Sequence, residues 1–219
     1  MRTATYRHVL CYYYSEKTKY YKDAVSAASG VRLLVASYVQ LQICGEKMAR
    51  NLVIYFSRKG QNYVNGDIVE LEKGNTELVA EYIRDAVGAD LFEIETVKEY
   101  PADYMECTEV AKQEQRDNAR PKLKAYLRDI SEYDNIVIAG PCWWGTYPCA
   151  VFTQLEKLHF RGKHVFPVMT HEGSGEAKSR TDLKKFCTGA KVAKSFAIQG
   201  SAVAGAGEKV AAWAHKHLD

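Results

Sequence analysis

The sequence predicts an α/β domain in which five parallel β-strands are covered by helices on both faces. Two observations support this fold class. After Met48, short apolar runs of strand length alternate with longer segments of helical period. The apolar runs are compact, as expected for strands that are buried on both faces of a parallel sheet. The 219 residues are enough for one domain with a substantial core.

Each expected strand is a short apolar run that stands before a polar or glycine-containing loop. The first run, NLVIYF, is typical of a buried strand. The run NIVIAG has the same character. In chain order, the expected strands are Asn51–Phe56, Asp90–Thr96, Asn135–Gly140, His164–Thr170 and Lys191–Ile198.

The segments between these strands have helical character. In the first of them, Leu78, Val79 and Ile83 fall on one face, and Asn75 or Thr76 is suited to cap the helix. In chain order, the expected helices are Asn75–Val87, Asp103–Asn118, Pro148–Leu158, Glu176–Phe186 and Ala206–Leu218.

Right-handed crossovers leave two strand orders for such a chain, 2-1-3-4-5 and 3-2-1-4-5. In both orders, ligands bind beyond the carboxyl ends of the strands, where the order reverses. We therefore expect function in the loops after Phe56, Gly140 and Thr170.

Charge and hydropathy exclude some classes of partner. The net charge is +3, but residues 1–47 contribute +4, which leaves −1 for the rest of the chain. A near-neutral body does not favour nucleic acid as a partner. No apolar run approaches the roughly 18–20 residues that span a bilayer, so we expect no membrane insertion.

The cysteines show neither a disulfide pattern nor the spacing of a metal site. We therefore expect reduced thiols, a cytoplasmic location and no metal. The six cysteines are Cys11, Cys44, Cys107, Cys142, Cys149 and Cys187.

Residues 1–47 differ from the remainder, because they hold seven of the 15 tyrosines and show little periodicity. The codons for Gly45-Glu46-Lys47 can form a purine-rich run before Met48, as in a bacterial ribosome-binding site. We therefore expect residues 1–47 to be a non-native or disordered extension and residues 48–219 to be the domain. The intact mass of protein made from the native gene tests this expectation.

The loop after the first strand has features of an anion site. Ser57 follows that strand, and Gly74-Asn75-Thr76 opens the first helix. Backbone N–H groups and the helix dipole favour negative charge at such a junction. A simple helix cap explains the same residues equally well. The sequence contains neither GxGxxG nor GxxxxGK[ST].

Two further loops follow the third and fourth strands. Pro141-Cys142-Trp143-Trp144-Gly145 contains adjacent tryptophans, which cannot both enter one core. At least one is expected to face solvent or a ligand, where it can support a planar heterocycle. Two structural tryptophans are the alternative. The loop Thr170 to Gly175 is short, polar and glycine-rich.

Together these loops resemble those of the flavodoxin family. The matching motifs are Tyr55-Phe56-Ser57-Arg58, Gly74-Asn75-Thr76, Pro141-Cys142-Trp143-Trp144-Gly145 and Thr170-His171-Glu172-Gly173-Ser174-Gly175. The resemblance implies a flavodoxin-like doubly wound sheet of order 2-1-3-4-5 and an FMN cofactor. It also implies that Ser57, Asn75 and Thr76 hold the phosphate. The flavin ring would then be lined by Trp143, Trp144 and Gly145 and bordered by Gly173, Ser174 and Gly175.

The phosphate loop departs from the family pattern. Ser57 to Thr76 spans 20 residues, 14 more than the compact Ser-x-Thr-Gly-Asn-Thr. Lys59 stands where a threonine hydroxyl is usual and can offset its loss by charge. Asn65-Gly66 lies between β-like runs, which predicts a hairpin with a type I′ turn. This hairpin is expected to cover the flavin, to contact a second subunit in a homodimer, or to be a surface decoration.

Two functions follow from the resemblance. One is an electron carrier that docks to redox partner proteins. The other is an oxidoreductase that takes hydride from NAD(P)H and reduces a quinone or similar small acceptor. We assign no catalytic residue, because the redox chemistry belongs to the flavin. A flavin-free binding module of the same fold is the remaining alternative.

Overall fold

The computed structural model describes residues 49–219. The expected extension 1–47 and its boundary at Met48 lie outside the described residues. The main sheet contains β1 (Asn51–Tyr55), β4 (Asp90–Glu93), β5 (Asn135–Pro141), β6 (His164–His171), β7 (Lys191–Val192) and β8 (Phe196–Gln199). A separate hairpin contains β2 (Gly60–Val64) and β3 (Asp67–Leu71). The helices are α3 (Asn75–Val87), α4 (Tyr104–Arg116), α5 (Cys149–Leu155), α6 (Ser179–Phe186), α7 (Gly200–Val203) and α8 (Gly207–Leu218).

The main sheet is parallel, and its order is β4-β1-β5-β6, with β7 and β8 both paired to β6. Counted as one interrupted strand, β7 and β8 make this the order 2-1-3-4-5. The flavodoxin-like order is thus confirmed, and the alternative 3-2-1-4-5 is excluded.

The expected strand Lys191–Ile198 is wrong as a continuous element. Val192 pairs with Val165 and Phe196 pairs with Val168. Phe196 is four residues after Val192, whereas Val168 is only three residues after Val165. One extra residue must leave the register, as in a β-bulge. The strand therefore divides into β7 and β8.

Other boundaries differ for local reasons. The strand expected to reach Thr96 ends at Glu93, and Thr96 instead forms a single antiparallel bridge with Leu123. The helix expected from Glu176 begins at Ser179, because Ala177 has a φ of 45°, which no α-helix accepts. The first helix has the expected bounds, Asn75–Val87.

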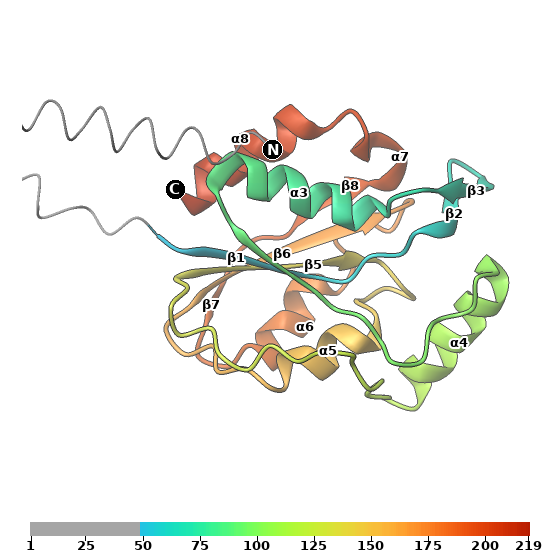
Figure 1. Ribbon diagram of the computed structural model, residues 1–219, viewed down its shortest axis with the longest axis horizontal. Helices are drawn as coiled ribbons and strands as arrows, with labels where there is room; N and C mark the ends of the chain where they lie inside the picture. Colours follow the sequence, from blue (N-terminus) through green and yellow to red (C-terminus); the bar gives the residue numbers. More distant parts are fainter. Residues whose placement is uncertain (1–48) are drawn as a thin grey trace, which may run out of the picture. The chain divides into compact units, whose positions relative to one another are not determined.

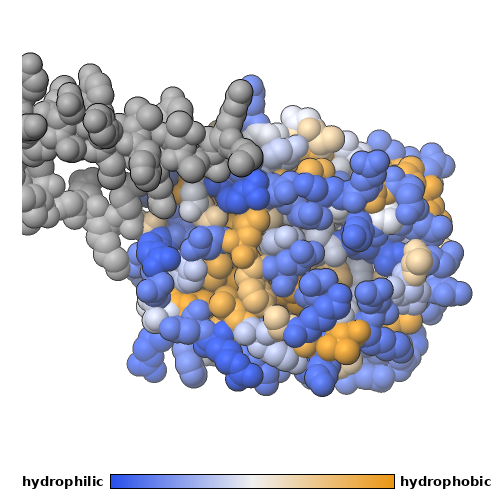
Figure 2. Space-filling model, in the orientation of Figure 1, coloured by the Kyte–Doolittle hydropathy of each residue, from blue (hydrophilic) through white to orange (hydrophobic). Residues whose placement is uncertain are grey.

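Helices cover both faces of the sheet, with α3 and α8 on one side and α5 and α6 on the other (Figure 1). Side chains along β1 alternate between the two layers. Leu52 and Ile54 join the core under α5 and α6, and Val53 and Tyr55 join the core under α3 and α8. The part of the surface coloured in Figure 2 is mostly hydrophilic and carries small hydrophobic patches.

The hairpin has the expected turn. Asn65 and Gly66 have φ values of 52° and 105°, and Val64 pairs with Asp67 across them. Positive φ at both central residues is the signature of a type I′ turn. The hairpin lies beside α4 (Figure 1).

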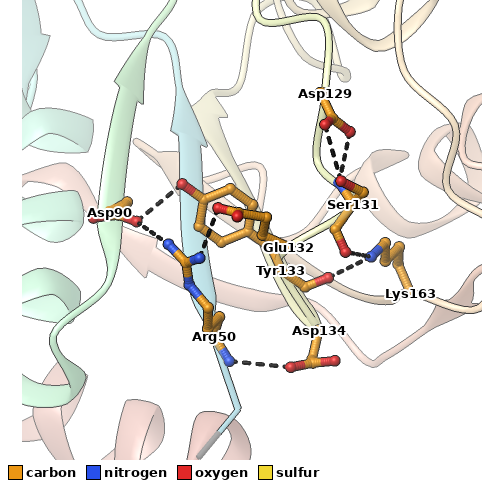
Figure 3. A network of polar contacts seen from close by, with 8 residues as sticks. All are labelled: Arg50, Asp90, Asp129, Ser131, Glu132, Tyr133, Asp134 and Lys163. Atoms are coloured by element: carbon orange, nitrogen blue, oxygen red, sulfur yellow. Dashed lines mark hydrogen bonds and ion pairs between the residues drawn. The ribbon is translucent and has the colours of Figure 1, made fainter.

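A polar network ties together the amino ends of the strands (Figure 3). The Arg50 guanidinium contacts Glu132 at 2.7 Å and Asp90 at 3.5 Å. The Lys163 ammonium donates to the carbonyls of Ser131 and Tyr133 at 2.9 and 2.6 Å. This end of the sheet is closed by structural contacts, whereas the carboxyl end carries the pocket described next.

Candidate functional site

A pocket lies at the carboxyl ends of β1, β5 and β6. In this strand order, β4 is added on one side of β1 and β5 on the other, and open α/β sheets bind ligands at this switch point between β1 and β5. The expected loops after β1, β5 and β6 all contribute to it. It is lined by Arg58, Asn62, Tyr63, Asn75, Thr76, Tyr104, Pro141, Cys142, Trp143, Thr170, His171, Glu172 and Gly200.

The 14-residue insertion is looped out, so that the two halves of the phosphate-type loop meet. A Cβ placed on Gly74 would collide with the Ser57 hydroxyl and would lie 2.5 Å from the Arg58 carbonyl oxygen. Only glycine permits this approach. Ser57 and Gly74-Asn75-Thr76 are therefore neighbours in space despite the insertion between them.

The start of α3 is capped from a distance. The N-cap residue, Gly74, has no side chain, and the Ser57 Oγ accepts the Glu77 N–H at 3.0 Å instead. The expected cap by Asn75 or Thr76 is therefore wrong. The Thr76 hydroxyl is buried and lies 2.8 Å from the Thr170 hydroxyl. This contact joins the loop after β1 to the end of β6.

One wall of the pocket involves α7, an element that sequence patterns did not indicate. A Cβ on Gly200 would collide with the Asn75 amide and lie 2.5 Å from Glu172 Oε1. The Glu172 carboxylate accepts the Ser201 N–H at 2.8 Å and the Gln199 side-chain amide at 3.2 Å. Glu172 is thus held in place beside Asn75.

The two adjacent tryptophans diverge, as expected. Trp143 and Thr146 exchange both backbone hydrogen bonds across a tight turn, at 2.8 and 3.2 Å. The central residues, Trp144 and Gly145, have φ values of 52° and 83°. A turn of this kind sends the side chains of consecutive residues in different directions.

The Trp143 side chain lines the pocket, whereas the Trp144 side chain contacts helix α4. The Trp143 ring packs edge-on against Phe56 and Tyr100, with centroids 5.3 and 4.9 Å apart. Trp144 is 47% exposed, and its indole N–H donates to the Thr108 carbonyl at 2.9 Å. Of the two, Trp143 is the one placed to contact a bound ring.

Several expected site residues do not line this pocket. Gly145 instead accepts the Lys178 N–H at 3.0 Å, and Gly173 donates its N–H to the His171 Nδ1 at 3.0 Å. The expected site residues outside the lining are Ser57, Lys59, Gly74, Trp144, Gly145, Gly173, Ser174 and Gly175.

Lys59 borders a neighbouring acidic pocket rather than the expected phosphate position. Trp143 and Arg58 line both pockets. Burial, followed by Glu77 and Glu95, raises the pKa of Glu93 in this second pocket. Its glutamates are Glu70, Glu72, Glu77, Glu93, Glu95 and Glu99, and its other charged residues are Arg58, Lys59 and Lys124.

Among residues 49–219, no group of three or more His, Cys, Asp or Glu side chains could hold a metal ion. No helix in the same part of the chain combines the length and the apolar character that crossing a membrane requires. The four cysteines described there are free thiols.

A doubly wound sheet with a polar, aromatic-lined pocket at its switch point defines a ligand-binding α/β protein. A family model described as flavodoxin matches residues 71–217. The chain therefore belongs to the flavodoxin family. The resemblance of its individual loops to particular family motifs stays a prediction.

Solved structures with the same fold include two from Bacteroides. The protein from Bacteroides uniformis ATCC 8492 is 27% identical, with a TM-score of 0.59, and the match covers 76% of this chain and 98% of that one. The protein from Bacteroides eggerthii DSM 20697 is also 27% identical, with a TM-score of 0.56, covering 74% and 98%.

A third structure is a flavoprotein in complex with FMN from Lactobacillus acidophilus NCFM. It is 18% identical, with a TM-score of 0.50, and the match covers 73% of this chain and 99% of that one. A comparison with curated protein sequences found no match.

Proposed function

We propose that this protein binds FMN in the pocket at the carboxyl ends of β1, β5 and β6 and transfers electrons through it. The observation that carries the proposal is the convergence of three loops at the switch point. They supply a helix N-terminus with hydroxyl and amide donors, an aromatic wall at Trp143 and a polar border at Thr170 to Glu172. The similar flavoprotein from Lactobacillus acidophilus is a complex with FMN, which supports the choice of cofactor.

The donor set fits a phosphate. Thr76 offers a hydroxyl and Asn75 an amide in the pocket lining, at the start of the 13-residue helix α3, and the neighbouring Ser57 hydroxyl caps this helix. Backbone N–H groups and the helix dipole add to this preference for an anion. The contact between Gly74 and the Arg58 backbone keeps the donors close together despite the insertion.

Bound flavin would supply the redox chemistry, since it accepts and releases electrons singly or in pairs. The protein would bind and orient it. The Trp143 ring, fixed by Phe56 and Tyr100, would exclude water from one part of the pocket. The Glu172 carboxylate would oppose the accumulation of negative charge nearby.

We favour an electron carrier as the mode of action. Residues 48–219 have a net charge of only −1, but negative charge is concentrated in one place. Six glutamates and three basic side chains line the pocket next to the proposed flavin site. Acidic surface beside a redox centre steers a basic partner protein toward it. The carrier would therefore dock to redox partners through this side.

The second candidate is an NAD(P)H-dependent oxidoreductase that reduces a quinone or similar acceptor. The small overall charge outside residues 1–47 favours it, since carriers usually show a strongly acidic face.

Anaerobic stopped-flow mixing of the FMN-loaded full chain with NADH or NADPH separates the two functions. A carrier should show no reduction within seconds, whereas fast bleaching of the flavin bands would establish the oxidoreductase and contradict our choice. Dithionite reduction of the same sample is the control that the flavin is competent.

A further inference from the structure

The insertion in the phosphate loop brings an aromatic pair to the pocket. Tyr63 of β2 and Tyr104 of α4 both line it. Their rings are stacked, with centroids 6.2 Å apart and planes at 23°. By contrast, the loop after β6, Thr170 to Gly175, contains no phenylalanine, tyrosine or tryptophan. Apart from Trp143, the tyrosines Tyr63 and Tyr104 are the large aromatic side chains in the pocket lining.

From this arrangement we infer that the β2–β3 hairpin forms a second aromatic wall of the flavin site, with Tyr63 as its ligand-contacting residue. The inference rests on the proposed function. It assigns the insertion a direct part in binding a planar heterocycle, in place of a subunit contact or a surface decoration.

Tyr63 has free surface for such a contact. It is 42% exposed although it stacks on Tyr104, and it lines the pocket, so a ligand there can cover further surface of this residue. A planar ligand that covers this surface gains from burial of apolar area and from stacking on the electron-rich ring.

Arg58 fixes the hairpin at its base. Its guanidinium donates to the Gln61 carbonyl at 3.0 Å, to the Pro101 carbonyl at 2.9 Å and to the Ala102 carbonyl at 2.7 Å. These contacts connect the start of the hairpin to the segment that precedes α4. Arg58 itself follows Ser57, so the same residue joins the phosphate-type loop to both tyrosine-bearing elements.

Two further contacts complete this attachment. The Asn62 side-chain amide donates to the carbonyls of Arg58 and Gly60 at 3.2 and 3.0 Å. The Tyr104 N–H donates to the Gln61 side-chain carbonyl at 2.9 Å. The wall is thus held in position before a ligand arrives, which lowers the entropy cost of binding.

Titration of the apo full chain with FMN, followed by quenching of flavin fluorescence, tests the inference. Tyr63→Ala should weaken FMN binding by roughly 5- to 20-fold, and Tyr63→Leu by somewhat less, because leucine restores bulk without an aromatic ring. Tyr63→Phe should stay within about twofold of wild type, because the ring is kept.

Ile68→Ala is the matched control. Ile68 pairs with Tyr63 across the hairpin and is 48% exposed, but it does not line the pocket. It should leave FMN affinity within about twofold. The inference is overturned if Tyr63→Ala and Tyr63→Leu bind FMN as tightly as wild type, or if Ile68→Ala weakens binding equally.

A riboflavin titration assigns the effect to the ring. Tyr63→Ala should lower the affinity for riboflavin and for FMN by a similar factor. A loss of affinity confined to FMN would mean that Tyr63 acts on the phosphate and would contradict the inference. If the proposed function itself is wrong, the titrations give a different result from the one that overturns the inference alone. In that case wild-type protein itself does not bind FMN, and the inference falls with it.

Discussion

Replacing Gly74 with alanine should damage both the stability of the domain and the phosphate side of the pocket. The added Cβ would lie 2.5 Å from the Arg58 carbonyl oxygen and 2.8 Å from its carbon, and it would collide with the Ser57 hydroxyl. The Arg58 carbonyl is backbone and also accepts the Asn62 amide, so it cannot move away without breaking that bond. Overpacking of this kind costs about 1–3 kcal/mol.

A second cost comes from the helix cap. Displacing Ser57 would remove the acceptor of the Glu77 N–H, and loss of a cap costs about 1 kcal/mol. Together we expect a loss of roughly 2–4 kcal/mol in the free energy of unfolding. The loss of one hydrogen bond to a charged phosphate, about 1.5 kcal/mol, should weaken FMN binding about tenfold.

Urea unfolding and FMN titration of Gly74→Ala measure these two effects. Gly205→Ala is the matched control, because a Cβ at Gly205 would meet nothing within 4 Å. Equal unfolding free energy and equal FMN affinity of Gly74→Ala and Gly205→Ala would contradict this prediction.

Three further predictions address other parts of the site and core. Trp143→Phe should weaken FMN binding by roughly 2- to 10-fold while Trp144→Phe leaves it unchanged, because only Trp143 lines the pocket; equal effects in fluorescence titrations would contradict this. Tyr147→Phe should lower the unfolding free energy by about 1–2 kcal/mol, since the buried hydroxyl donates to carbonyls of β5 and β6 at 3.1 and 3.2 Å; an unchanged urea midpoint would contradict it. Burial raises the pKa of Glu114, partly offset by the hydrogen bond from Tyr100. Its protonated form therefore stabilises the fold below its ordinary pKa of 4.5, and this contribution is lost as pH rises through the raised pKa. Glu114→Gln should thus flatten the fall in stability above pH 4.5, and an unchanged slope in urea unfolding from pH 4 to 7 would refute it.

The main strands and most helices could be predicted from the sequence, because buried parallel strands are continuous apolar runs and the segments between them have helical periodicity. Asn51–Phe56 and Asn135–Gly140 are clear cases of such strands. The crossover rule alone left two strand orders open, and the resemblance to flavodoxins chose between them. The interruption between β7 and β8 could not be predicted, because it depends on a one-residue mismatch with the neighbouring strand β6. The positive φ of Ala177 also has no signal in residue type.

The site was partly predictable for a similar reason. Trp143 and Thr170 follow or end particular strands, Asn75 and Thr76 open the first helix, and the carboxyl ends of parallel strands converge at one edge. Tyr63 and its partner on α4 were missed, because their position depends on how the insertion folds back across the domain. The motif Tyr-Phe-Ser-Arg already contained Arg58, but its bonds to backbone carbonyls cannot be read from sequence.

The central claim is that the pocket binds FMN and recognises its phosphate at the start of α3. Parallel titrations of the apo full chain with FMN and riboflavin test this claim most directly. We predict one FMN per chain, with riboflavin bound at least roughly tenfold more weakly because it lacks the phosphate. Failure to bind either flavin, or equal affinity for both, would contradict the account.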